Sequence, residues 1–362
     1  MKILTRYILR EFIKPFILAL MFFTVIILIV RVLEELQFIL NSHPGLWLTF
    51  KYLILQVPAF IQIVIPIAVL FGVLIDLGGL AKTSELMAMR AGGANIFTAA
   101  VPLFFAGMVI CVLSLFFSEI VVPNANQMAR RTKEIEIEHK TDQSAETFRQ
   151  NLSMRGGDNT LYHIGTFDGS KNTLTDILIL QFDNSSNLKT RVDAKGAHYQ
   201  DGHWIFENGF IRTFNGSDDE ISAQPFDQTV VDLPDKPSDF IKEQKELPER
   251  SIAELMLYVQ QLKKNGLDCH KELVELHNKI AFPFGCAILA LLGVPWGWSM
   301  GKFSGVIYSF GICLLVGLAY IGGMQIGHTI GDSGAVPPFV AIWSINLIFA
   351  AIGPVMIFRR NR

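Results

Sequence analysis

The chain has 362 residues, 51% of them hydrophobic and 18% charged, with a formal net charge of −2 at pH 7. This total shows no basic excess of the kind that nucleic-acid-binding proteins carry, and three of the four cysteines lie in apolar segments, which excludes a disulfide framework. Three long apolar runs precede an acidic stretch of more than 100 residues and three follow it. This order predicts a membrane protein with one large extramembrane domain.

Six uncharged runs are the candidate membrane helices. They cover residues 15–30, 52–75, 91–118, 280–301, 303–331 (with one His) and 333–358. A helix needs about 20 apolar residues to cross a bilayer, and five runs reach that length. The first reaches it when Arg31, Val32 and Leu33 are included. No small-x-small cleavage site follows it, so we expect a retained helix rather than a signal peptide.

Basic residues near the ends of these runs predict the orientation, because short loops rich in Lys and Arg stay in the cytoplasm. Ten such residues fall on one side and four on the other, which predicts that both termini are cytoplasmic and the acidic stretch is periplasmic. The ten are Lys2, Arg6, Arg10, Lys14, Lys82, Arg90, Lys302, Arg359, Arg360 and Arg362; the four are Arg31, Lys51, Lys271 and Lys279.

A short amphipathic helix is predicted at residues 82–92, between the second and third runs. Hydroxyl groups and an acid stand at its start, and Gly92 and Gly93 at its end. It is either a plain connector or a helix that inserts into a groove on a cytoplasmic protein. In the second interpretation Glu85, Leu86 and Met89 make the contact, with Arg90 in the last turn.

The acidic stretch reads as short strands separated by turns. Strands are expected at residues 161–167, 175–182, 189–199, 203–206 and 210–214, with turn signals that include Asp201–Gly202 and Asn208–Gly209. We therefore predict an antiparallel β domain of sandwich or jelly-roll type. Trp204 and Phe206 share one face, which is either a packed core or a trough for acyl chains.

A capping box at Ser251 and Glu254 predicts a helix that runs to about Lys264, with Gly266 as its stop. Arg31 is followed one turn later by Glu34 and Glu35, so an ion pair within the helix is the plain interpretation. Cations at this outer boundary also suit anionic lipid headgroups. Arg31, Arg130, Lys133 and Lys279 are the candidates for such contacts.

No catalytic or metal-binding signature is present in the sequence. HExxH, paired CxxC and G-x-S-x-G are all missing, and Gly301–Lys302 lacks the rest of a phosphate-binding loop. The carboxylates Asp76, Glu119 and Asp332 stand near segment ends, which argues against a proton-coupled transporter. We expect no enzyme activity, no metal and no cofactor, and any transport would draw energy from a partner.

The chain resembles the LptF/LptG permeases of the lipopolysaccharide-export ABC transporter over nearly its whole length. The features that carry the resemblance are the basic opening at residues 6–11, the Ser84-Glu85-Leu86 segment with Met89 and Gly92, and the order of three helices, domain and three helices. Two further segments complete it, at residues 277–283 and 292–295. The LptG type is favoured by the placement of Arg31 and by the prolines Pro337, Pro338 and Pro354.

The resemblance implies a permease subunit of the bacterial inner membrane that pairs with a second permease above an ATPase dimer (LptB). Lipopolysaccharide would enter from the outer leaflet and pass to periplasmic LptC and LptA. By position, Glu85 matches the acid of a coupling helix, while Arg31, Arg130 and Lys133 match lipid-facing basic positions. Lys279 is a further candidate whose role is alternatively structural.

The expected fold is therefore a six-helix membrane protein (3 + 3) with an inserted periplasmic β-jellyroll-like domain. Its parts are residues 1–122 (helices 1–3), 123–250 (β domain), 251–270 (connecting helix) and 271–362 (helices 4–6). Two other functions remain open: a membrane-anchored periplasmic scaffold or sensor, and an ion-coupled transporter.

Overall fold

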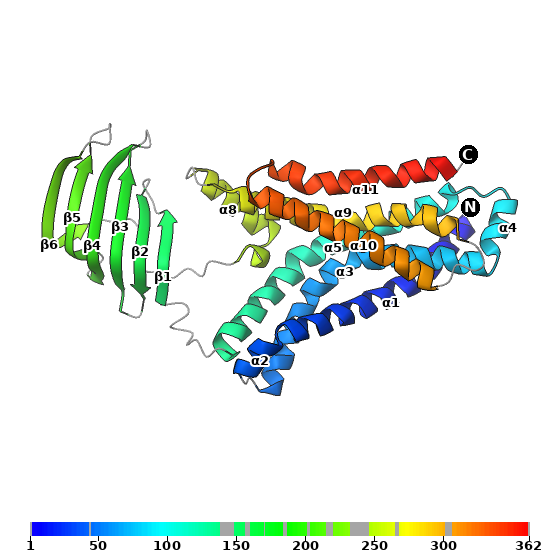
Figure 1. Ribbon diagram of the computed structural model, residues 1–362, viewed down its shortest axis with the longest axis horizontal. Helices are drawn as coiled ribbons and strands as arrows, with labels where there is room; N and C mark the ends of the chain where they lie inside the picture. Colours follow the sequence, from blue (N-terminus) through cyan, green and yellow to red (C-terminus); the bar gives the residue numbers. More distant parts are fainter. Residues whose placement is uncertain are drawn as a thin grey trace. The chain divides into compact units, whose positions relative to one another are not determined.

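The computed structural model describes residues 2–42, 45–137, 148–155, 160–169, 171–183, 187–200, 203–214, 220–231, 246–264, 268–300 and 306–360. The chain forms two compact units, a helical unit (residues 1–130 and 246–362) and a β unit (residues 131–245). Their elements are labelled in Figure 1. The turn predicted at Asp201–Gly202, the helix stop at Gly266 and the segment Gly301–Lys302 lie outside the described residues.

Six helices in the described residues are long and apolar enough to cross a membrane, and each overlaps one of the six predicted runs. Three precede the strands: α1 (Lys2–Glu34), α3 (Leu46–Lys82) and α5 (Phe97–Arg131). Three follow them: α9 (His270–Trp298), α10 (Val306–Asp332) and α11 (Pro338–Arg360). The shorter elements are α2 (Leu36–Ser42), α4 (Glu85–Ala91), η1 (Thr132–Ile137), η2 (Leu247–Glu249) and α8 (Ile252–Lys264).

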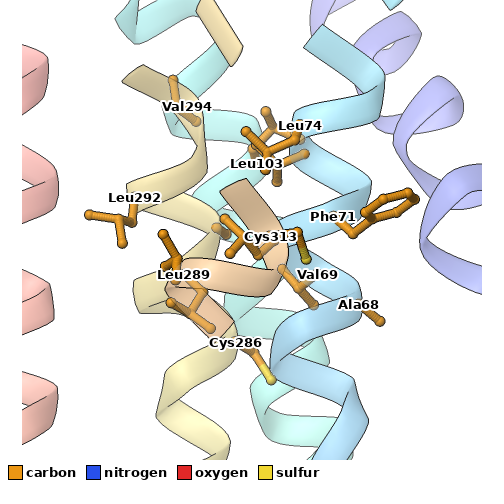
Figure 2. Packing of buried hydrophobic residues seen from close by; sticks show 14 of the residues in the cluster. Ala68, Val69, Phe71, Leu74, Leu103, Cys286, Leu289, Leu292, Val294 and Cys313 are labelled. Atoms are coloured by element: carbon orange, nitrogen blue, oxygen red, sulfur yellow. The ribbon is translucent and has the colours of Figure 1, made fainter. Parts of the chain in front are cut away.

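The core of the helical unit is built around α3 and α9. About 70% of the apolar window of each is buried (72% and 67%), against 17–33% for the other four long helices. Figure 2 shows Leu74 of α3, Leu103 of α5, Leu289 of α9 and Cys313 of α10 gathered in one apolar cluster. The four cysteines of the chain are all buried and all carry free thiols.

Close backbone approach and a few polar contacts fix the helices within this core. A side chain on Gly107 of α5 would come within 2.9 Å of the Cys286 carbonyl oxygen of α9, so only glycine allows these two helices to pack this closely. Asn346 of α11 donates its amide to the Ala281 carbonyl at 2.7 Å and accepts from the Tyr320 hydroxyl at 2.9 Å. These bonds join α9, α10 and α11.

The β unit contains one antiparallel sheet of six strands in the order β1-β2-β3-β4-β5-β6. The strands are β1 (Phe148–Arg155), β2 (Thr160–Asp168), β3 (Thr173–Phe182), β4 (Leu188–Gln200), β5 (His203–Phe214) and β6 (Glu220–Val231). A jelly roll needs two sheets and Greek-key connections. The described strands instead pair only with their sequence neighbours, so the predicted jelly-roll topology is wrong for this part of the chain.

Two further details of the sheet differ from the sequence prediction. The turn expected at Asn208–Gly209 does not form, and both residues lie inside β5, where Gly209 pairs with Ala194. Asn208 takes a positive φ of 53°, which a turn-forming residue such as Asn tolerates within a strand. The strands β1 and β6 were not predicted.

One face of the sheet carries its apolar core. Trp204 and Phe206 of β5 are 1% and 0% exposed, and they cluster with Tyr162, Ile164 and other apolar residues of β2, β3 and β4. The face that was expected to be either a packed core or an open trough is thus packed in this structure. Burial of large aromatic side chains is the main contribution to the stability of such a sheet.

Candidate functional site

The predicted amphipathic helix between the second and third long helices is α4. Ser84 begins it in a left-handed conformation (φ 64°), which turns the chain sharply after α3. Gly92 ends it, with its N–H donated to the Ala88 carbonyl at 2.9 Å. Figure 1 shows α4 at the same end of the helical unit as the two chain termini.

Both ends of α4 are held by long helices of its own unit. The Tyr7 hydroxyl of α1 donates to the Glu85 carboxylate at 2.8 Å, and the Arg90 guanidinium lies 5.0 Å from the centre of the Trp298 ring at the end of α9. Such a cation–π contact contributes about 0.5–1 kcal/mol at an exposed site. Sequence reasoning found neither partner, because both lie far away in the chain.

The side chains of α4 divide between an inner and an outer face. Leu86 is 2% exposed and belongs to the apolar core of the helical unit, so it is not available to a partner as the sequence analysis expected. Met87, which the sequence analysis did not select, is 64% exposed. A shallow hollow of about 520 Å³ between α4 and the start of α1 is lined by Ile3, Leu4, Tyr7, Glu85, Ala88 and Met89.

Arg31 lies at the opposite end of α1 in a network of polar side chains. Its guanidinium is 3.0 Å from the Glu34 carboxylate and 3.1 Å from that of Glu35, which confirms the predicted ion pair within the helix. It also donates to the Gln56 side chain of α3 at 3.2 Å, and Tyr52 donates to Glu35 at 2.9 Å. The Arg31 side chain still has 42% of its surface exposed.

Arg130 forms an ion pair that the sequence did not reveal. Its guanidinium lies 2.6 Å from the Glu249 carboxylate, and the two side chains are only 18% and 4% exposed. Burial raises the pKa of Glu249 above its usual range, although the nearby Arg130 charge acts to lower it. Glu249 belongs to the segment between the β unit and α8, residues 246–251, which we call the strap.

Lys279 of α9 holds the same strap. Its ammonium group donates to the carbonyl oxygens of Pro248 and Arg250 at 3.2 and 2.8 Å, and the residue is 8% exposed. Of the two roles considered for Lys279, a lipid contact and a structural contact, this geometry corresponds to the structural one. A buried ammonium group needs acceptors of this kind to offset its lost hydration.

The start of α8 follows the strap and has its N–H groups capped twice. The predicted capping box forms, with Ser251 Oγ accepting from the Glu254 N–H at 3.1 Å and the Glu254 carboxylate accepting from the Ser251 N–H at 3.0 Å. Glu119 of α5 accepts from the N–H groups of Ile252 and Ala253 at 2.6 and 3.3 Å. A carboxylate is favoured at a helix N-terminus by the helix dipole.

The four predicted headgroup residues differ in their described contacts and in the unit that holds them. Arg130 and Lys279 both bind the strap, while the described contacts of Arg31 are with α1 and α3. Lys133 lies in η1, which belongs to the β unit. The sequence correctly indicated that Arg31 sits at a helix end, but the pairing of Arg130 with a carboxylate 119 residues later depends on the fold.

Two further polar features lie in the helical unit, and sequence reasoning missed the first of them. Next to Lys279 is a cavity of about 310 Å³ whose lining includes Glu275 and His328; His328 lies 3.2 Å from Glu275 and 3.1 Å from Asp332. Asp76 of α3 is 5% exposed, and neither of its carboxylate oxygens has a hydrogen-bond partner. Asp76 was expected near a segment end, and α3 continues six residues past it to Lys82.

Within the part of the chain that the structure describes, no group of three or more His, Cys, Asp or Glu side chains is arranged to hold a metal ion. The contacts at both ends of the helical unit involve side chains and backbone carbonyls of the same chain. Their chemistry is that of docking and positioning, with cations, carboxylates and an exposed thioether at the surface.

Comparison with known proteins gives a consistent result. Residues 6–360 match the family model described as lipopolysaccharide export system permease LptF/LptG. The chain is 25% identical to LptG of Haemophilus influenzae over 98% of the chain and 95% of that protein. It is 27% identical to LptG of Escherichia coli K12 over 68% of the chain and 67% of that protein, and 22% identical to LptF of the same strain over 98% and 94%. The higher identities are to the LptG type.

Proposed function

Because the chain belongs to the LptF/LptG family of lipopolysaccharide export system permeases, we propose that it is a non-catalytic permease subunit of an ABC transporter that exports lipopolysaccharide. It works in the bacterial inner membrane, with six membrane-spanning helices arranged three before and three after a periplasmic β domain, and with both termini in the cytoplasm. A second permease of the same family completes the channel, and an LptB-like ATPase dimer supplies the energy.

The observation that carries this proposal is the placement of α4. It is a short helix between two spanning helices and is held by Tyr7 and Trp298. It carries an exposed Met87, and its residues Glu85, Ala88 and Met89 line a hollow. A cytoplasmic ATPase that binds α4 can move α1 and α9 through the contacts of α4 with Tyr7 and Trp298. Glu85, Met89 and Arg90 are the coupling residues in this proposal, with Leu86 anchoring the helix to the core.

At the periplasmic end, Arg31 and Lys133 are the proposed direct contacts for lipid phosphates. The Arg31 side chain has 42% of its surface exposed, and its guanidinium can exchange a carboxylate for a phosphate because both accept in the same bidentate geometry. Arg130 and Lys279 act at this end by holding the strap, which leads from the β domain to α8. Lipopolysaccharide then passes to LptC-like and LptA-like periplasmic proteins.

A mild-detergent pull-down of the tagged chain, followed by mass spectrometry of proteins and lipids, tests the proposal. We expect recovery of a cytoplasmic ATPase, a second six-helix permease and lipopolysaccharide. The variant Glu85→Ala should lose the ATPase or uncouple hydrolysis from export, whereas Glu272→Ala, at a half-buried position in the first turn of α9, should not. Recovery of the chain alone, or with periplasmic proteins only and no lipid, would instead favour the scaffold or sensor function.

A further inference from the structure

An apolar groove between α1 and α5 lies outside every contact discussed so far. It encloses about 820 Å³, and its lining includes Leu9, Ile13 and Phe16 of α1 and Val101, Phe105 and Val109 of α5. This volume is within the range of about 300–1,000 Å³ that is typical of ligand sites. Several lining side chains remain exposed, among them Val101 at 50%, Phe105 at 63% and Val109 at 59%.

The groove has the length of one membrane leaflet. On α1 its lining runs from Thr5 to Ile17, and at 1.5 Å per residue this distance is about 18 Å. The hydrocarbon core of a bilayer is about 30 Å thick, so one leaflet measures about 15 Å. Lining positions recur every three or four residues on both helices, which places them in one stripe along each. The groove therefore runs parallel to the acyl chains of one leaflet.

One end of the groove is polar and basic, whereas its body is apolar. Thr5, Asn95 and Thr98 line the end nearest the N-terminus of α1. Arg6 follows Thr5 directly and is exposed, and Arg10 stands exposed one turn later. Among the described residues no hydrogen bond or ion pair involves Arg6 or Arg10. Two unpaired cations thus stand at the polar end of an acyl-sized groove.

We propose that the α1/α5 groove binds an anionic phospholipid of the cytoplasmic leaflet, with an acyl chain in the groove and the phosphate at Arg6. The basic residues at one end of the groove favour an anionic headgroup, and the leaflet-long apolar body of the groove fits an acyl chain. Lipopolysaccharide is excluded, because the polar end lies with the N-terminus of α1 and hence, in the proposed topology, in the leaflet opposite to the one that supplies the export substrate. The groove is a site for a resident lipid.

The test is native mass spectrometry of the full chain in its purified complex, reconstituted in nanodiscs that contain phosphatidylglycerol and phosphatidylethanolamine. We expect retained phosphatidylglycerol in preference to phosphatidylethanolamine. Val101→Trp fills the groove and should reduce the retained phosphatidylglycerol at least tenfold. Arg6→Gln should reduce it about fivefold, the factor expected for one basic residue at a membrane surface.

Matched controls lie on the same two helices. Lys14→Gln removes an exposed charge from α1. At 100° per residue, Lys14 lies about 140° round the helix from the centre of the groove-lining residues, so its side chain points away from the groove. Val121→Trp places the same bulk at an exposed position of α5 that lies beyond the groove and, at 100° per residue, about 130° round the helix from its lining stripe. Both should retain the lipid. The proposal would be overturned if test and control variants lost the same amount of phosphatidylglycerol, or if the wild-type chain retained both phospholipids equally. Cross-links showing that a helix of the second permease fills the groove would also overturn it.

Discussion

The two ends of the helical unit hold a short segment in different ways. At one end α4 is held by an exposed hydrogen bond from Tyr7 and a cation–π contact with Trp298. At the other end the strap is held by a buried ion pair and by a buried ammonium group. Exposed contacts of this kind contribute about 1 kcal/mol or less, whereas breaking a buried pair costs several. The difference teaches that α4 can exchange its polar contacts at little cost while Leu86 keeps it on the core, whereas releasing the strap from α5 and α9 is costly.

The largest expected effect comes from breaking the buried pair. Arg130→Ala leaves the Glu249 carboxylate buried without its partner, which costs about 3–5 kcal/mol in a fully buried pair. We expect the lower end of this range, because Arg130 is 18% exposed. Thermal unfolding in detergent, together with proteolysis at residues 246–251, measures the loss. Arg131→Ala, an exposed neighbour, is the control.

The same variant should become sensitive to pH in a defined direction. The pKa of Glu249 is already raised by burial, and removing Arg130 raises it further. The folded state then binds a proton more tightly than the unfolded state, so stability is highest below the unfolded pKa and falls as pH rises through the folded pKa. An Arg130→Ala defect that stays constant from acid to neutral pH would contradict this assignment.

A smaller loss is expected when the second contact of the strap is removed. Lys279→Ala deprives the Pro248 and Arg250 carbonyls of their donor, and buried acceptors left unsatisfied cost about 1–3 kcal/mol. The thermal unfolding temperature should fall in Lys279→Ala. The control Lys271→Ala, at an exposed position of the same helix, should leave this temperature unchanged. If Lys279→Ala weakens lipopolysaccharide binding without any shift, Lys279 is a lipid contact instead.

At the α4 end, the expected change in stability is about 1 kcal/mol or less, but function should suffer. Tyr7→Phe removes only the hydroxyl that donates to Glu85. Because this bond links α4 to α1, we expect the lipopolysaccharide exported per ATP hydrolysed to fall severalfold in the reconstituted complex. Tyr308→Phe, at an exposed position of α10, serves as the control. Unchanged coupling in Tyr7→Phe would show that the hydrogen bond does not transmit motion.

The smallest effect on stability is expected for Arg31→Gln. Its ion pairs within the helix each contribute about 0.2–0.5 kcal/mol, and Glu35 keeps its bond from Tyr52. The unfolding temperature should barely move, while lipopolysaccharide retained by the purified complex should fall severalfold. The control variant Lys82→Gln changes a basic residue at the other end of the helical unit and should retain lipopolysaccharide as the wild-type chain does. Retention by Arg31→Gln equal to wild type would remove Arg31 from the headgroup contacts.

Features that depend on local sequence were predicted well. The six long helices follow from uninterrupted apolar runs, α4 follows from its start and stop residues, and the start of α8 follows from its capping box. Strands β2, β3 and β4 were recognised because apolar residues alternate between clear turns. In each case the determining residues lie within a few positions of one another, where propensity and periodicity act.

Features that depend on the fold were not predicted. Arg130 was assigned to lipid because it was expected at the outer membrane boundary, but its partner Glu249 follows only after the whole β unit. The Asn208–Gly209 pair has turn chemistry, yet pairing with β4 and β6 carries the strand through it. The strands β1 and β6 contain many polar residues, so alternation did not identify them.

The buried cysteines of this chain have a practical consequence for labelling. Cys111, Cys286 and Cys313 lie in the helix core at 0–1% exposure, and Cys269 is 8% exposed. A thiol must be reached as a thiolate in order to react, so maleimide reagents should leave the folded chain almost unmodified. A single cysteine introduced at the exposed Met87 would then carry a spin label or fluorophore selectively. The wild-type chain is therefore a ready background for testing whether α4 moves when the proposed ATPase partner hydrolyses ATP.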